Sequence, residues 1–279
     1  MKFETQGFLH LKEVIPSGVL QNTQVAFDAA SQRYYDQWRQ SVKVGTGEAR
    51  FFDIPNILDQ GSVFVDLVDL STIFELLVDI VGQDIQLNHT HARLFYPGPT
   101  FTPPWHSDMM SVLGVDHAHT SNFLVKIHYF IEDLRPDQGC LAFIPGSHRY
   151  PAKHPTPVIA DVEKSPAAVK IVPKAGDAVI FNTHLLHMAL DNRSDVVRKS
   201  IIYAYSHYWM KHYANSVPTD LERFANTPQR KQLFGVDIEG VPYFNRRLQG
   251  NIDQPWHSTL LSASKRLIKR ALLRNSTFG

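Results

Sequence analysis

A long central region of short apolar runs, each closed by a turn, constrains this chain most. Between Asp84 and Tyr205 the runs are rich in β-branched and aromatic residues, and proline, glycine and asparagine separate them. Short strands at such spacing are typical of an antiparallel sandwich or barrel. We expect strands at 86–96, 123–131, 141–144, 169–172, 178–182 and 199–204.

Helices are expected to precede this β region. A short strand at 7–15 is followed by a helical pattern from 17 to about 39, and apolar residues at three- and four-residue steps predict one helix over 63–81. Since no linker divides the sequence, we expect one domain over 1–279. It would have a helical support at 1–83, a β core at 84–206 and a C-terminal extension at 207–279.

Composition excludes several classes of partner and location. There are 28 basic and 27 acidic residues, and a net charge of +1 gives no field that would favour nucleic acid. The single cysteine, Cys140, cannot form an internal disulfide, and the N-terminus lacks an apolar signal-like run. No window is apolar enough to span a membrane. We therefore expect a cytoplasmic protein without a membrane or nucleic-acid role.

A histidine and an aspartate two positions apart form the first candidate metal-binding unit. They are His106 and Asp108, in a segment that follows two prolines and a tryptophan. In an extended segment, side chains at i and i+2 point to the same side, so both could reach one ion. The H-x-D pattern is common by chance. It indicates a metal site only if a third ligand is present.

A second unit can supply the third ligand. A Gly-Asp turn at 176–177 enters an apolar strand that ends in His184 and His187. Residues three apart on a strand face opposite sides, so we expect only one of these histidines to bind the ion. Two histidines and one carboxylate leave adjacent positions open on Fe(II), whereas zinc prefers four ligands and is the alternative metal.

A third unit could bind an organic anion. Arg198 and Ser200 lie two apart at the start of a strand and share a face. A guanidinium and a hydroxyl so placed can hold a carboxylate, and the distal carboxylate of 2-oxoglutarate suits them.

These motifs, taken in order, resemble those of the phytanoyl-CoA dioxygenase family. The resemblance covers roughly residues 4–205, and it is densest between 103 and 205. Its parts are the opening T-Q-G-F-L at 5–9, H-x-D, the segment D-Q-G-C-L-A-F-I-P-G-S-H-R at 137–149, Gly176-Asp177, and His187 followed by Asn192 and Arg198. Several motifs in register are far more specific than any one of them.

The resemblance implies a fold and an activity. The fold would be mainly β with flanking helices around a double-stranded β-helix, the cupin-like jelly roll. Its iron ligands would be His106, Asp108 and His187, with Arg198 holding 2-oxoglutarate. Positions that line the co-substrate site in similar proteins fall on His91 and His128. The cofactor would be Fe(II), with 2-oxoglutarate and O2 as co-substrates.

The same resemblance bears on the reaction and on the substrate. Related halogenases have a small residue in the carboxylate position, so Asp108 favours hydroxylation, dealkylation, desaturation or cyclisation over halogenation. We expect a small, polar metabolite as substrate, and a homo-oligomer is compatible with the sequence. The residues expected to contact the substrate or to form its rim are Lys126, Ser107, His117, His119 and Trp209.

Two other classes of function stay open. The chain could be a zinc-dependent enzyme, or a barrel that binds a small molecule without catalysis. A basic amphipathic pattern at 260–274 could dock on an anionic membrane, but packing on the protein itself is the commoner outcome.

Overall fold

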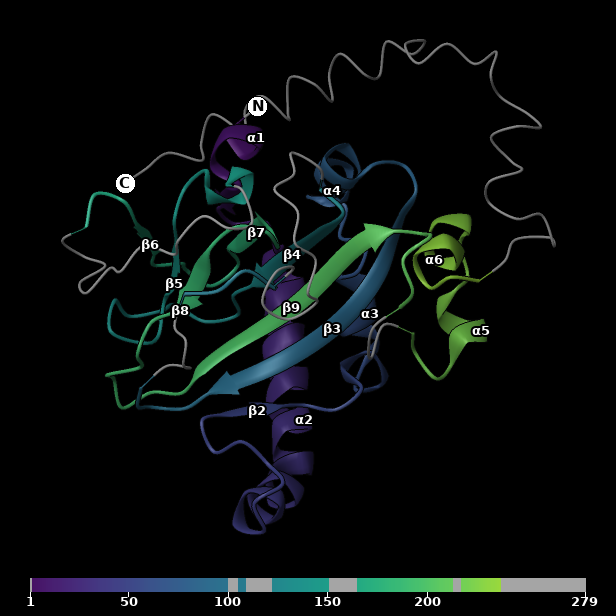
Figure 1. The fold of residues 1–279 in the computed structure, drawn as a ribbon. Helices are drawn as coiled ribbons and strands as arrows, with labels where there is room; N and C mark the ends of the chain where they lie inside the picture. The colour runs from purple at the N-terminus through teal and green to yellow at the C-terminus, as the bar shows by residue number, and fades with distance from the viewer. Residues whose placement is uncertain (1, 100–104, 109–121, 151–164, 213–216, 237–279) are drawn as a thin grey trace, which may run out of the picture.

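Two antiparallel sheets form the centre of the structure, a computed structural model that describes residues 2–99, 105–108, 122–150, 165–212 and 217–236 (Figure 1). Among these residues, one sheet has six strands in the order β1-β7-β4-β9-β3-β2, and the other has three in the order β6-β5-β8. The chain crosses between the sheets from β4 to β5, from β6 to β7 and from β8 to β9, which makes a jelly roll. The strands are β1 (Phe8–Leu11), β2 (Phe51–Asp53), β3 (Ile85–Phe95), β4 (Leu124–Tyr129), β5 (Leu141–Phe143), β6 (Val169–Ile171), β7 (Ala178–Asn182), β8 (His187–Ala189) and β9 (Arg198–His207).

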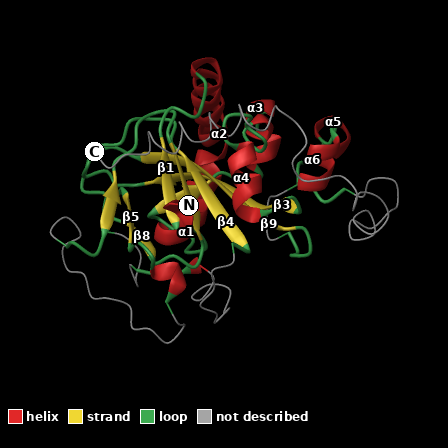
Figure 2. Ribbon diagram, turned by 90° about the horizontal axis from the view of Figure 1, so that it is seen from above, coloured by secondary structure: helices red, strands yellow, loops and turns green. Residues whose placement is uncertain are grey.

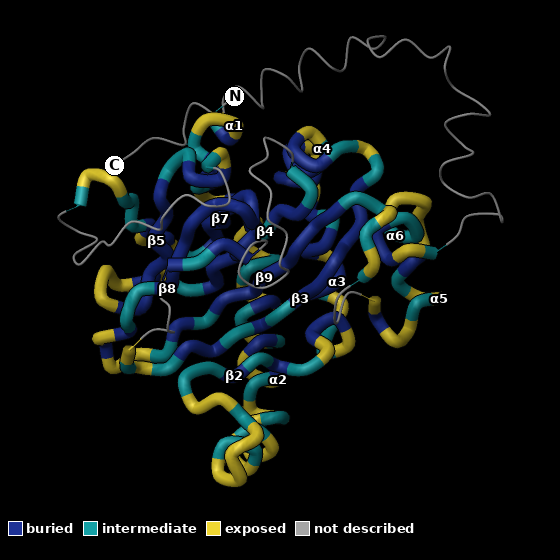
Figure 3. Tube along the Cα trace, in the orientation of Figure 1, coloured by how far each residue is buried: buried dark blue, intermediate teal, exposed yellow. Residues whose placement is uncertain are grey.

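Helices cover one face of the larger sheet, and the smaller sheet lies against the other (Figure 2). The long helix α2 runs behind the larger sheet and extends past its edge, where its far end is exposed (Figure 3). The helices are α1 (Lys2–Gln6), α2 (Ser17–Lys43), α3 (Ser62–Asp66), α4 (Phe74–Val81), α5 (Leu221–Phe224) and α6 (Pro228–Leu233), with 3-10 turns at Ile57–Asp59 and Ser147–Arg149.

The outer face of the larger sheet forms the main apolar core with these helices. Alternate residues of the central strand β9, namely Ile201, Tyr203 and Tyr205, point to this face and are fully buried. Because side chains alternate along a strand, the intervening residues of β9 point to the face that meets the smaller sheet. That inner face carries Arg198, Ser200 and other polar groups, so the two faces differ in character.

The single helix expected over 63–81 is two helices, α3 and α4, with a turn between them. Three buried tyrosines of the larger sheet donate their hydroxyls to backbone carbonyls in and just after α3: Tyr203 to Phe64, Tyr129 to Leu67 and Tyr205 to Val68, at 2.6–3.0 Å. These carbonyls do not accept hydrogen bonds within the helix. The tyrosine hydroxyls supply the hydrogen bonds that buried carbonyls require. The apolar residues keep a helical period across both helices, and the chain leaves the helix where these tertiary contacts form.

The expected strands agree with the structure within a few residues. Segment 178–182 coincides with β7, and 199–204 lies inside the longer β9. The short strands β2 and β8 were missed. No helix of the described residues is long and apolar enough to cross a membrane. The basic pattern at 260–274 lies outside the described residues.

Candidate metal centre and co-substrate site

A backbone bridge brings two histidines together that are distant in sequence. The amide of His106 donates to the carbonyl of His187 at 3.1 Å, and the amide of His187 donates to the carbonyl of His106 at 2.9 Å. Their imidazole centroids are 4.4 Å apart. Asp108 lies two residues after His106. One potential metal-ligand atom from each of the three residues lies within 4.8 Å of the other two. The group can hold one metal ion, as the spacing of H-x-D predicts.

The environment of His187 prepares its imidazole for metal binding. Its Nδ1 lies 2.8 Å from the carbonyl oxygen of Leu185, so the proton is held on Nδ1 and Nε2 is left as the ligand atom. Burial lowers the pKa of His187 to about 4, and the nearby charge of His106 acts in the same direction. The ring of Phe181 packs 4.8 Å away. His187 is therefore neutral and oriented near pH 7.

Asp108 is the negative charge of this group. Its Oδ1 is 4.0 Å from Nε2 of His106, and its Oδ2 is 3.6 Å from Nε2 of His187. Burial alone would raise the pKa of Asp108, but the ammonium of Lys126, 2.9 Å from Oδ2, holds that pKa well below its usual range. The carboxylate is ionised and available to a cation. Two imidazoles and one carboxylate suit Fe(II), with coordination positions left open.

The inner face of the larger sheet extends away from this group as a polar surface. Strand β9 is its middle, and each inward residue of β9 has inward neighbours on the flanking strands. The neighbours are Lys126 and His89 beside Ala204, His128 and His91 beside Ile202, and Arg93 beside Ser200.

Arg198, Ser200 and His128 offer buried polar atoms toward one region of this face. Within the described part of the chain, Nε of Arg198, Oγ of Ser200 and Nδ1 of His128 are buried without a hydrogen-bond partner. Burial lowers the pKa of Arg198 to about 10, so its guanidinium remains charged at neutral pH. Buried polar atoms are rarely left unpaired unless a ligand or water completes them. A carboxylate fits these donors.

The position of Arg198 is defined by a glycine turn. The guanidinium donates to the carbonyl of Gly139 and lies over the ring of Phe95, 4.8 Å from its centroid. Gly139 has φ +65°, and a Cβ there would lie 2.9 Å from Phe95. Only glycine fits both the left-handed backbone and the close contact.

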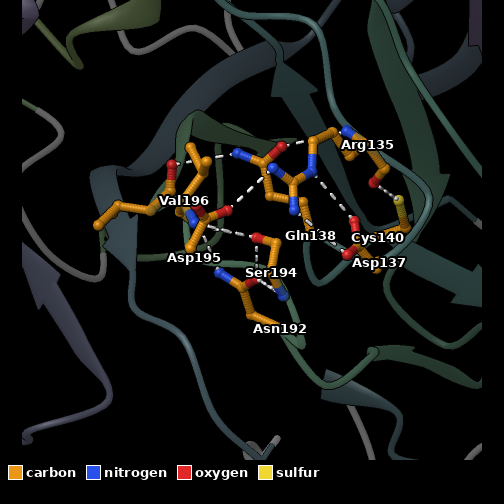
Figure 4. A network of polar contacts seen from close by, with 9 residues as sticks. Arg135, Asp137, Gln138, Cys140, Asn192, Ser194, Asp195 and Val196 are labelled. Carbon is orange, nitrogen blue, oxygen red and sulfur yellow. Dashed lines mark hydrogen bonds and ion pairs between the residues drawn. The ribbon is translucent and has the colours of Figure 1, made fainter.

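A polar network joins this turn to the loop that leads into β9 (Figure 4). The side-chain amide of Gln138 donates to the carbonyl of Val197 at 3.2 Å. Asn192 donates to the carbonyls of Phe95 and Val196, at 3.2 and 2.8 Å. The asparagine five residues after His187 therefore holds the start of β9, and with it Arg198, against β3.

Sequence reasoning missed Arg93, Asp53 and His89. Arg93 makes a two-pronged ion pair with Asp53 of β2, with both N···O distances 2.6 Å. His91 lies 3.7 Å from the same carboxylate, and burial lowers the pKa of His91 to about 4. His89, His91 and Arg93 are two residues apart on one strand, so the sequence could have placed them on the same face. The short strand β2, which carries Asp53, has no pattern that predicts it.

Burial also keeps the other inward histidines neutral. It lowers the pKa of His89 and of His128 well below the ordinary histidine value, and the positive charge of Lys126 lowers both further. These rings act as neutral hydrogen-bonding groups near pH 7.

The remaining candidate residues lie in varied places. The hydroxyl of Ser107 is buried and donates to the carbonyl of Thr183 at 3.2 Å, and its contact with a substrate stays a prediction. His184 is buried outside the metal group. We expected His184 and His187 at the end of one strand. Instead, His184 lies in the turn between β7 and β8, and His187 begins β8. Trp209 is 60% exposed and stacks on His207, whereas His117 and His119 lie outside the described residues.

Two buried or concave features lie apart from this chemistry. Burial raises the pKa of the Cys140 thiol to about 11, and its Sγ donates to the carbonyl of Arg135, as expected of a packed cysteine. A cavity of about 390 Å³ opens between the edges of β1 and β6, lined by residues such as Phe8, His10 and Lys170. It contains none of the metal-binding residues.

A jelly roll that gathers two histidines and one aspartate, with a buried arginine in its larger sheet, fits the class of Fe(II)- and 2-oxoglutarate-dependent oxygenases. The model of the phytanoyl-CoA dioxygenase family matches residues 3–200. The chain belongs to this family of Fe(II)- and 2-oxoglutarate-dependent dioxygenases. The resemblance inferred from the motifs is confirmed.

Individual relatives support this membership. The chain is 32% identical over 222 residues to the peroxisomal phytanoyl-CoA dioxygenase of Bos taurus, covering 71% of this chain and 65% of the bovine one. It is 38% identical over 81 residues to the dioxygenase cdmD of Talaromyces verruculosus, covering 29% of this chain and 24% of cdmD. The matches thus span less than two thirds of both relatives.

A solved structure shares the fold. HygX from Streptomyces hygroscopicus, with nickel and 2-oxoglutarate bound, has a TM-score of 0.57 at 18% identity, covering 78% of this chain and 90% of HygX. This likeness, with the antiparallel sheets described above, confirms the expected jelly roll.

Proposed function

We propose that the protein is an Fe(II)- and 2-oxoglutarate-dependent dioxygenase that oxidises a small, polar metabolite. One observation carries the proposal. The group formed by His106, Asp108 and His187 opens on the same inner face as three unsatisfied polar atoms, those of Arg198, Ser200 and His128. A metal ligand set and a carboxylate cradle on one face are what an iron-chelating keto acid requires.

The residues of the chain divide the work of binding. His106, Asp108 and His187 would hold the metal, and Arg198 with Ser200 would hold the distal carboxylate of 2-oxoglutarate. When bound, Fe(II) supplies the activation of O2 that couples oxidation of a substrate C–H bond to conversion of 2-oxoglutarate into succinate and CO2. Hydroxylation is the simplest outcome. Dealkylation, desaturation and cyclisation use the same residues.

The polarity of the inner face supports a polar substrate. Among the described residues near the metal group, it presents Lys126, His89 and His91. Among the substrate contacts expected from the sequence, Lys126 has the placement that fits, and Trp209 remains a prediction for the rim. Polar groups at fixed positions set the orientation of a small ligand.

The test is formation of succinate from 2-oxoglutarate in the presence of Fe(II) and O2, with an Asp108→Ala variant as comparison. We expect slow succinate formation even without the physiological substrate, and its loss in the variant. A zinc enzyme would keep zinc through purification and form no succinate. A non-catalytic binding barrel would retain affinity for its ligand in the Asp108→Ala variant.

A further inference from the structure

Among the residues that the structure describes, the ammonium of Lys126 has one carboxylate as its ion-pair partner. Its side chain is 17% exposed on the inner face, and Nζ lies 2.9 Å from Oδ2 of Asp108. On β3, beyond the intervening strand β9, the corresponding inward residue is His89, on the other side of Ala204. Burying a cation is costly unless an anion or a set of acceptors compensates it.

Metal binding would take this partner away. A divalent cation held by Asp108 competes with Lys126 for the same carboxylate, and it repels the ammonium as well. Lys126 therefore requires another anion when the metal is bound.

The other charges of the inner face already have partners. Arg93 is neutralised by Asp53 through two contacts of 2.6 Å, and in the proposed function Arg198 takes the distal carboxylate of 2-oxoglutarate. The nearby histidines are neutral because burial lowers their pKa values. Once Arg198 holds the distal carboxylate, Lys126 is the cation among these groups whose anionic partner the metal displaces.

The position of Lys126 separates it from the distal carboxylate of 2-oxoglutarate. Lys126 lies beside Ala204, whereas the proposed cradle is at Ser200 and Arg198. The two positions are at least four residues apart along β9, so their backbones are separated by about 13 Å or more. An anion at Lys126 is therefore separate from the distal carboxylate at Arg198, and the two candidates are the metal-side carboxylate of 2-oxoglutarate and a carboxylate of the substrate.

We propose that Lys126 binds a carboxylate of the substrate, so that the protein oxidises a small organic acid. This inference rests on the proposed function and names its substrate class. Because Lys126 contacts a metal ligand directly, an acid held there lies beside the metal. The oxidised carbon should then be close to the acid group in the substrate.

The test compares acids with their amides on the protein loaded with Ni(II) and 2-oxoglutarate, since nickel occupies the site without turnover. Calorimetry is used first to measure nickel and 2-oxoglutarate binding, and then binding of the pairs benzoate and benzamide, and butanoate and butanamide. We expect the acids to bind at least about tenfold more tightly than the amides. Lys126→Gln should abolish this preference, and Lys126→Arg should retain most of it.

Exposed Lys12 provides a matched control, because Lys12→Gln removes an equal charge away from the inner face. It should leave the preference unchanged, and thermal unfolding verifies that each variant is folded. The inference is overturned if the unmodified protein shows no preference for acids. It is also overturned if Lys126→Gln alters only nickel or 2-oxoglutarate affinity, which would make Lys126 a partner of Asp108 or of the co-substrate. Failure of nickel and 2-oxoglutarate to bind at all would instead contradict the proposed function, and this inference with it.

Discussion

The buried guanidinium of Arg198 has a stacking partner and a carbonyl acceptor, but its Nε is unsatisfied. A structural arginine in such a place would normally have its donors paired. The pattern is that of a side chain held ready for a ligand, with Phe95 and Gly139 defining its position.

Replacing Arg198 with leucine should weaken 2-oxoglutarate binding while leaving metal affinity nearly unchanged. Hydrogen bonds to charged groups contribute roughly 1.5–3 kcal/mol, so the dissociation constant should rise about tenfold to a hundredfold. Calorimetry on the nickel-loaded protein measures both constants. Arg193, which is exposed in the preceding loop, supplies the matched control Arg193→Leu. Equal 2-oxoglutarate affinity in both variants would remove Arg198 from the co-substrate site.

At the scale of elements, buried hydroxyls join the larger sheet to the helices that cover it. The three tyrosine bonds described above end in and just after α3, where the helix stops. They explain why a sequence with unbroken helical periodicity folds as two helices.

Tyr203→Phe should lower the free energy of unfolding by about 1–2 kcal/mol, because the buried carbonyl of Phe64 would lose its donor. Urea denaturation measures the change. Tyr35 on α2 is 42% exposed, so Tyr35→Phe is the matched control and should have little effect. An equal effect of the two substitutions would show that the hydroxyl of Tyr203 is not what stabilises the break.

A second joint lies at Asp177, at the start of β7. Its carboxylate accepts from the amides of Glu13 and Lys174 at 3.0 and 2.9 Å, and it lies 2.8 Å from Nε2 of His10. Burial alone would raise the pKa of Asp177, but these contacts lower it below the ordinary value. The aspartate of the Gly-Asp turn therefore stabilises the fold, because it connects β7 to the N-terminal segment.

Because the folded pKa of Asp177 is below its unfolded value, its ionisation stabilises the fold above about pH 4, and this contribution is lost as pH falls through the folded pKa. Asp177→Asn should therefore destabilise the protein by about 1–3 kcal/mol near pH 7 and by less near pH 3. Urea denaturation across this range measures the difference. Asp36→Asn, at an exposed position of α2, is the control. A difference that stays constant with pH would contradict this assignment.

For the whole molecule, the sequence predicted what depends on local pattern. Side chains alternate between the two faces of a strand. This alternation predicts the strands themselves, the pairing of His106 with Asp108 and the shared face of Arg198 and Ser200. The pairing of His106 with His187, the ion pair of Arg93 with Asp53 and the break before Ile73 depend on contacts between distant segments. A single sequence carries little signal for such contacts, and family motifs supplied part of what parity could not.

In the proposed function, His106, Asp108 and His187 hold the Fe(II) on which 2-oxoglutarate binds. Anaerobic titration of the protein with Fe(II) and then with 2-oxoglutarate tests it most directly. We predict that a weak visible absorption band forms only when both are present, saturates at one iron per chain, and is absent in Asp108→Ala. Absence of the band in the unmodified protein, or an unchanged band in Asp108→Ala, would contradict the account.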